Sequence, residues 1–287
     1  MNPNPPANPD SPVGRYRSLS VTRLEKQGAY LAEPALEGGE VLLPARFVPE
    51  GTAVGDRFDV FVYTHSEDRP VATTQTPHAA VGDFAYLRVV DTSVHGAFLD
   101  WGLDKDLFAP RDEQIRDLEE GDKAVFAVQL HAKTNRVIAC SRLAPHFSYE
   151  VEGLRSGDLV DLLVYGKTEQ GYRVVVNGRY AGMVYFSEAF VKLQLGQRTE
   201  GYVSQLRDDG RIDVRLQRAG QAGVADAESV LLHAIDDAGG FLDLHDKSDP
   251  KEIRARLGIS KKVFKKAAGG LYRRRKIAIE DGGLRRV

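Results

Sequence analysis

Basic side chains are concentrated near the C-terminal end of the sequence, where they could bind phosphate groups. Residues 247–276 hold 12 lysines and arginines against 2 acidic residues, although the whole chain has a formal net charge of −2. No acidic residue lies within 260–276, so ion pairs inside this segment cannot neutralise it. The pattern favours nucleic-acid contact, because binding depends on the local patch more than on the average charge. The expected contacts are Lys261, Lys262, Lys265, Lys266, Arg273, Arg274 and Arg275.

Aromatic and arginine side chains could add a second contact by stacking on unpaired bases, which is worth about 1–3 kcal/mol per base. Three Gly-led strings place such a residue at one position: Tyr30 in GAYL, Phe98 in GAFL and Arg173 in GYRV. Further along the third string's segment, Tyr185 and Arg179 are also expected RNA contacts. For Tyr30 and Phe98, stacking on RNA and packing inside the domain remain equally open.

Other rings are better explained by packing. We expect Phe108 and Phe186 to lie in the core and Trp101 to shape the loop that carries it. The single cysteine, Cys140, lies in the strand-like run RVIAC and is predicted to be a buried, neutral thiol.

Three segments repeat one pattern of glycine, alternating strand, short turn and second strand. They begin at Gly55, Gly121 and Gly196, and each follows one of the Gly-led strings. About five short strands in each unit predict a mostly β protein with three tandem five-stranded barrels of the OB type. The alternative is a single large sandwich of ordinary hairpins. The predicted barrels span 14–76, 77–146 and 147–218.

The remaining sequence has a different residue pattern, which is typical of an α+β module. A small-residue linker follows Arg218, and helical spacing begins near Glu228. Asp249-Pro250 and Ser260 are helix-start signals that predict helices at 250–257 and 260–275. KIAIE and GLRRV flank Asp281-Gly282-Gly283 and predict a hairpin. Three helices followed by a hairpin indicate a winged helix-turn-helix at 226–287.

Composition predicts a cytoplasmic protein without membrane spans. Residues 1–13 are rich in proline and asparagine, lack the features of a targeting peptide, and are expected to form a disordered arm. No apolar run approaches the ~18 residues of a membrane helix.

No pattern predicts an enzyme. The sequence holds no Walker loop, nucleophile motif or dinucleotide fingerprint. Asp243, His245, Asp246 and Asp249 could suggest a metal site, but turn and cap roles before a helix explain them better. We therefore expect no metal, no cofactor and no catalytic residue.

The middle unit resembles the RNA-binding repeat of bacterial ribosomal protein S-one. The resemblance rests on Val81-Gly82, GAFL from Gly96, DLFAP from Asp106 and Gly121-Asp122, with GMVYFSE from Gly182 matching in the third unit. The whole arrangement resembles the conserved virulence factor B family, through GAFLDWGLDKDLFAP and LHDKSDPKEI followed by SKKVFKKA. That resemblance implies three such barrels, a C-terminal winged helix, RNA binding and effects on gene expression.

The charge of each unit predicts which barrel binds RNA best. The middle unit has 8 basic and 11 acidic residues, whereas the third has 10 of each. In the middle unit, Asp100, Asp104 and Asp106 lie close to the strands that carry the expected stacking ring, Phe98. Carboxylates repel phosphate, so the third barrel and the basic tail should bind single-stranded RNA best. The function expected is post-transcriptional regulation, with ribosome association left open. The alternative is a DNA-binding transcription regulator whose barrels bind protein or ligand.

Overall fold

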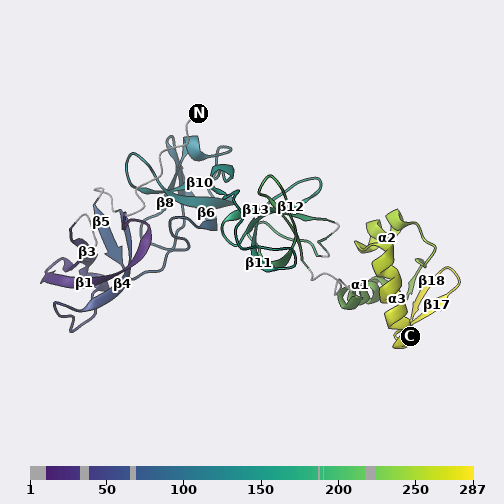
Figure 1. Ribbon diagram of the computed structural model, residues 1–287. Helices are drawn as coiled ribbons and strands as arrows, with labels where there is room; N and C mark the ends of the chain where they lie inside the picture. The colour runs from purple at the N-terminus through teal and green to yellow at the C-terminus, as the bar shows by residue number, and fades with distance from the viewer. Residues whose placement is uncertain (1–10, 33–38, 65–68, 187, 190, 217–223) are drawn as a thin grey trace. The chain divides into compact units, whose positions relative to one another are not determined.

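Three closed barrels and a winged helix-turn-helix make up the protein in the computed structural model (Figure 1). The structure describes residues 11–32, 39–64, 69–186, 188–189, 191–216 and 224–287. It divides into two compact units between Phe147 and Ser148, the first holding two barrels and the second holding the third barrel and the winged helix. The fold predicted from the repeats is confirmed, and the single-sandwich alternative is wrong.

Each barrel has five strands in the same order, with the third and fifth strands parallel. The first consists of β1 (Arg15–Glu25), β2 (Gly28–Ala32), β3 (Val41–Pro44), β4 (Arg57–Thr64) and β5 (Pro70–Thr73). The middle one consists of β6 (Phe84–Ser93), β7 (Gly96–Leu99), β8 (Leu107–Pro110), β9 (Lys123–Leu130) and β10 (Val137–Cys140). The third consists of β11 (Leu159–Lys167), β12 (Gly171–Val176), β13 (Tyr180–Tyr185), β14 (Arg198–Leu206) and β15 (Ile212–Arg215). Short 3₁₀ turns lie at Ala45–Phe47, Arg111–Glu113 and Ala144–His146.

Two backbone features recur in all three barrels. The first strand has a register shift at the same place, before Arg23, Asp91 and Gly166. Such bulges bend and twist a strand, which helps a small barrel to close. The glycine that opens the second strand, Gly28 or Gly96 or Gly171, packs directly on the third strand. A Cβ there would lie 2.0–2.3 Å from a carbonyl oxygen of that strand, so the approach requires glycine.

One hydrophobic core is shared by the first two barrels. Trp101 joins it, with its ring edge-on to Phe61 at 5.6 Å between centroids and its Nε1 donating to the Ala79 carbonyl at 2.8 Å. Val13, expected in the disordered arm, is instead only 1% exposed in this core, and the side chain of Asn135 donates to Ser11. Residues 1–10 lie outside the described residues.

Cys140 is fully buried, and burial raises the pKa of its thiol to about 12. The thiol is therefore protonated at neutral pH, as the sequence predicted.

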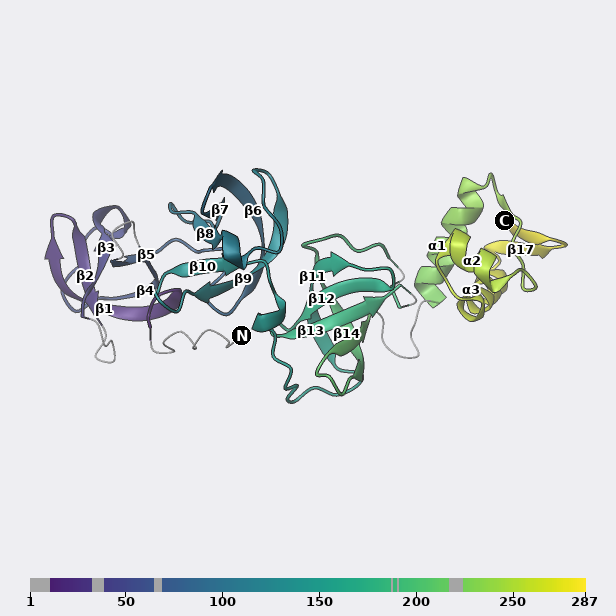
Figure 2. The same ribbon diagram turned by 90° about the horizontal axis from the view of Figure 1, so that it is seen from above.

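The winged helix consists of α1 (Val224–Asp237), β16 (Phe241–Leu242), α2 (Pro250–Leu257), α3 (Lys261–Arg273), β17 (Ile277–Glu280) and β18 (Gly283–Arg286). Both predicted caps are present: Asp249 accepts from the Lys251 amide at 2.8 Å, and Ser260 from the Val263 amide at 3.4 Å. The wing formed by β17 and β18 extends from the helices (Figure 2).

Two details of the module differ from prediction. The long helix ends at Arg273 rather than at 275, because Arg275 has φ of 55° and turns the chain toward the wing. The two-residue strand β16, which pairs with β18, was not predicted. The small-residue linker lies largely outside the described residues, since 217–223 are not described. No helix in the described ranges is long and apolar enough to cross a membrane.

Candidate nucleic-acid interface

One row of paired residues crosses four neighbouring strands at the same place in every barrel; we call it the platform row. It is Arg23, Tyr30, Leu42 and Val71 in the first barrel. It is Asp91, Phe98, Phe108 and Ile138 in the middle barrel, and Gly166, Arg173, Met183 and Asp213 in the third. Tyr30, Phe98 and Arg173 are thus structurally equivalent, as their strings suggested.

In the first barrel one face of the Tyr30 ring, the ring of the platform row, is covered by a side chain of the same barrel. The guanidinium of Arg23 lies 3.4 Å from the centroid of the Tyr30 ring, and its Nε lies 2.8 Å from the Glu40 carboxylate. Gln27 donates to the Tyr30 hydroxyl at 2.8 Å. Because an internal cation already occupies one face of the ring, Tyr30 is a poorer stacking site than its position suggested.

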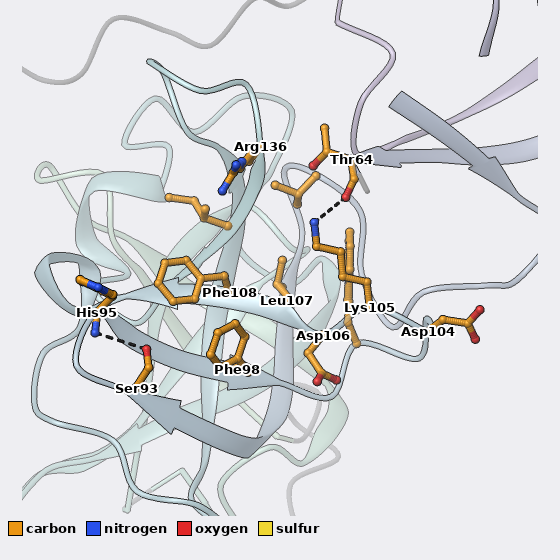
Figure 3. A pocket seen from close by; sticks show the side chains of 13 residues that line it. Thr64, Ser93, His95, Phe98, Asp104, Lys105, Asp106, Leu107, Phe108 and Arg136 are labelled. Atoms are coloured by element: carbon orange, nitrogen blue, oxygen red, sulfur yellow. Dashed lines mark hydrogen bonds between the residues drawn. The ribbon is translucent and has the colours of Figure 1, made fainter. Parts of the chain in front are cut away.

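In the middle barrel the platform opens into a cavity of about 510 Å³, shown in Figure 3. Phe98 and Phe108 face each other on β7 and β8, with centroids 5.3 Å apart and planes inclined by 44°. Both rings line the cavity and are only partly buried. The prediction that Phe108 is a core residue is therefore wrong, because its strand alternation turns it outward beside Phe98.

The carboxylates near this cavity are not equivalent. Asp104 forms an ion pair with Arg46 and accepts from the Gln75 amide at 3.1 Å, and its side chain points away from the rings in Figure 3. Asp106 lines the cavity, and its pKa is raised by burial first and then by the nearby charges of Asp100 and Asp91. Asp106 is therefore the cavity-lining carboxylate that is not paired with Arg46, and Asp91 of the platform row adds a second negative charge near it.

Two cations of the middle barrel that the sequence did not single out also line the cavity. Lys105 donates to the Thr64 carbonyl of the first barrel at 2.8 Å, and Arg136 lies just before β10. No sequence signal separated them from other surface cations, because their placement depends on how the strands close.

The third barrel replaces the ring pair by an exposed cation. Arg173 is exposed on β12, in the place that Phe98 occupies in the middle barrel. Tyr185 is half-buried, and its hydroxyl accepts a hydrogen bond from Arg207, whose Nε lies 2.9 Å from Asp213. The Tyr185 ring is therefore held at one end, which the sequence could not show because Arg207 follows β14, far from Tyr185 along the chain.

Phe186 follows β13 and is exposed rather than buried, so the prediction that it packs in the core is wrong. Its ring stands edge-on to Tyr172, with 5.2 Å between centroids and 87° between planes. The Lys167 ammonium lies 5.5 Å from the Phe186 centroid. An exposed ring held by a buried tyrosine and bordered by a cation suits base stacking next to phosphate.

Arg179 lies apart from these residues. It belongs to the turn between β12 and β13, whereas Tyr185 pairs with Gly171 at the opposite end of the same hairpin. Five residue steps separate the two ends, about 16 Å in a strand. The structure therefore does not bring Arg179 together with Tyr185, and its guanidinium lies beside the Tyr180 ring instead.

On α3 the exposed side chains Lys262, Lys266 and Arg273 follow helical spacing opposite the buried Phe264 and Leu271. We call these three cations, with Gly269 between them, the cationic face. Among the described residues, no carboxylate forms an ion pair with any of the three; the Arg273 Nε donates to the Gly269 carbonyl of its own helix at 3.2 Å.

Other expected cations of this segment are already engaged. Arg274 forms an ion pair with Glu228 of α1, whose side chain is only 7% exposed. Lys265 lies 3.8 Å from Asp246, and Lys261 donates to the Ser248 carbonyl at 2.9 Å. No ion pair forms inside this segment, as its sequence indicated, but carboxylates of α1 and of the segment before α2 pair with Arg274 and Lys265 from outside it. Arg275 is exposed after the helix.

The acidic residues before α2 serve the fold. Asp243 binds Arg256 at 2.6 Å, which lowers the pKa of the carboxyl, and Asp249 caps α2. In the described part of the chain, no group of three metal-ligating side chains is present.

Comparison with known proteins agrees with this architecture. Residues 13–75 match the S1 domain and residues 229–285 match the CvfB-like winged helix domain. YitL of Bacillus subtilis (strain 168) is 28% identical over 283 residues, covering 94% of this chain and 92% of that protein. Conserved virulence factor B of Staphylococcus epidermidis (strain ATCC 12228) is 24% identical, with 95% and 94% covered.

A solved multidomain protein with nucleic acid binding domains from Streptococcus pneumoniae is 24% identical, covers 96% of this chain and 99% of its own, and has a TM-score of 0.43. The S1 and OB architecture of the barrels is a nucleic-acid-binding one. The chain thus combines an S1 domain and a CvfB-like winged helix domain with similarity along nearly its whole length to conserved virulence factor B.

Proposed function

We propose that this protein binds single-stranded RNA in the cytoplasm and acts as a post-transcriptional regulator, by binding rather than by catalysis. The observation that carries the proposal is the cationic face of α3, where Lys262, Lys266 and Arg273 are exposed without a carboxylate partner among the described residues. Such cations bind phosphates with release of counterions.

The third barrel supplies the second contact. Phe186 offers an exposed ring for stacking, Lys167 lies beside it, and Arg173 is exposed on the platform row. Rings and cations on one barrel fit an unpaired strand, because its bases are free to stack while its phosphates meet the positive charges.

Duplex DNA is the second candidate, because α3 occupies the place of the recognition helix in a helix-turn-helix fold. Gly269 lies in the middle of its exposed face, and a Cβ there would meet nothing within 4 Å, so a backbone can approach closely. Against this candidate, the exposed ring of the third barrel has no role on a fully stacked duplex.

Competition binding tests the proposal. The full chain is bound to a labelled unstructured RNA and challenged with unlabelled RNA or duplex DNA of equal length at one fixed salt concentration. We expect the RNA to compete at a lower concentration than the duplex. A duplex that competes better would replace the proposed function by DNA binding through α3.

A further inference from the structure

The cavity of the middle barrel has the shape and lining of a site for one flat aromatic group. Its volume of about 510 Å³ lies in the range of small-molecule sites. Its apolar lining consists of Phe98, Trp101, Leu107, Phe108, Val137 and Ile138. Figure 3 shows the two phenylalanine rings at the centre of this lining. A nucleobase could contact these rings, and the chain belongs to a nucleic-acid-binding class.

The polar lining adds a requirement for hydrogen-bond donors. Asp106 lies immediately before β8 and two residues before Phe108, about 7 Å along an extended chain, and both side chains line the cavity. No hydrogen bond or ion pair engages Asp106 within the residues that the structure describes, whereas Asp104 is paired with Arg46. An ionised carboxylate only accepts hydrogen bonds.

We propose that this cavity holds one unpaired guanine base, stacked against Phe98 and Phe108, with its Watson–Crick edge toward Asp106. Guanine presents two adjacent donors on that edge, N1–H and the 2-amino group, which match the two oxygens of a carboxylate. The other bases present at least one acceptor next to their donor there, and an acceptor against a carboxylate is repelled. The proposal rests on the proposed function, because it names the base that this site takes from bound RNA.

The surroundings of Asp106 favour a ligand that donates. Asp91 and Asp100 are close enough to raise the pKa of Asp106, so donors that reach its carboxylate would relieve an unfavourable charge. Lys105 and Arg136 line the same cavity, so the phosphate of the bound nucleotide would lie near positive charge.

The fluorescence of the single tryptophan, Trp101, reports on the cavity directly, because it belongs to the lining. The full chain is titrated near pH 8 with guanosine monophosphate and with inosine monophosphate, which lacks only the 2-amino group. A bidentate contact at a base edge discriminates by about 5- to 150-fold, so we expect at least about fivefold tighter binding of the guanosine nucleotide. Equal affinities, or no binding of either, would overturn the proposal.

Two matched variants assign the preference to one carboxylate. Asp106→Asn should abolish it, because the amide offers only one acceptor. Asp104→Asn should retain it, since Asp104 lines the same cavity but is engaged by Arg46. The Asp106→Asn protein should melt at the same or a higher temperature, because the substitution removes charge facing Asp91 and Asp100. A guanine preference that survives Asp106→Asn would refute the assignment.

A second titration separates this proposal from the function on which it rests. Oligouridine with one central guanosine is compared with plain oligouridine by fluorescence anisotropy. Tighter binding of the guanosine-containing strand, lost in Asp106→Asn, supports the assignment to RNA. Equal binding of both strands overturns that assignment but leaves RNA binding standing. If neither strand binds while guanosine monophosphate does, the proposed function fails and the cavity is a site for the free nucleotide.

Discussion

The middle and third barrels share a strand order and a platform row, yet the row carries different chemistry in each. In the middle barrel it presents Phe98 and Phe108 in a cavity beside Asp106. In the third it presents exposed Arg173, and the exposed ring, Phe186, follows the end of β13. A cavity with a carboxylate can choose among bases, whereas an open cationic surface binds any strand. The same barrel backbone can therefore select a base in the middle barrel and supply affinity for RNA in the third.

The largest expected effect belongs to the affinity side of this comparison. Reversing charge at Lys262, Lys266 and Arg273 together should weaken RNA binding about a hundredfold near 0.1 M salt and flatten the log–log salt slope by about 2. Each lost phosphate contact removes about 0.7 from that slope for a single strand. The control reverses Lys26, Lys123 and Lys133, which are equally exposed on the first two barrels. Equal losses in both variants would show that only net charge matters.

Removing the exposed ring of the third barrel tests whether stacking contributes there. Phe186→Ala should weaken RNA binding by about 1–3 kcal/mol and change the melting temperature little, because the ring is exposed. The neighbouring Tyr172 is buried, so Tyr172→Ala should lower the melting temperature instead. If Phe186→Ala binds RNA with full affinity, the third barrel contributes charge alone.

Adjacent arginines separate binding from folding on α3. Arg274→Ala leaves Glu228 buried without its partner and should destabilise the winged helix by about 1–3 kcal/mol, measured by denaturant unfolding. Arg273→Ala should leave stability almost unchanged and reduce RNA affinity, because this side chain belongs to the cationic face. The opposite pattern would mean that Arg274, not Arg273, contacts RNA.

Acid should remove the selectivity of the middle barrel. Since the pKa of Asp106 is raised, its carboxylate protonates at a higher pH than an ordinary aspartate, and the protonated form cannot accept both guanine donors. The guanosine-over-inosine preference should be complete near pH 8 and fall as pH drops through that pKa. Other charged or titratable groups line the cavity, namely His95, Asp104, Lys105 and Arg136. A pH dependence that persists in Asp106→Asn would therefore belong to one of them.

The smallest effects come from two neighbouring glycines of α3. A Cβ at Gly269 would meet nothing within 4 Å, so Gly269→Ala should stabilise the helix by about 0.5–1 kcal/mol. A Cβ at Gly270 would lie 2.1 Å from the Glu228 carboxylate, so Gly270→Ala should lower the melting temperature. If RNA approaches closely at Gly269, the stabilised variant should also bind it more weakly.

Local signals in the sequence predicted the fold well. Gly28, Gly96 and Gly171 marked equivalent strands because each packs against a carbonyl of the next strand, and that contact requires glycine. Asp249 and Ser260 marked helix starts because capping involves only nearby amides. The strand β16 was not predicted, because two residues are too few to show the alternation of buried and exposed side chains that marks a strand.

The candidate site was less predictable, because its chemistry depends on contacts between distant segments. Arg23 over Tyr30, Arg274 with Glu228 and Asp104 with Arg46 each decide whether a side chain remains available. Phe108 and Phe186 illustrate the same limit. Either ring could face inward or outward by composition, and only the closed barrel fixes the direction.

Crosslinking tests most directly whether the middle barrel selects the base while the third barrel and α3 supply affinity for RNA. A uridine-rich RNA with one guanosine is crosslinked by ultraviolet light to the full chain, and the attached peptides are mapped by mass spectrometry. We predict uridine adducts at Tyr185 or Phe186 and on the exposed Tyr272 of α3, and the guanosine adduct at Phe98 or Phe108. Adducts confined to the first barrel, or an absence of adducts from both the third barrel and α3, would contradict the account.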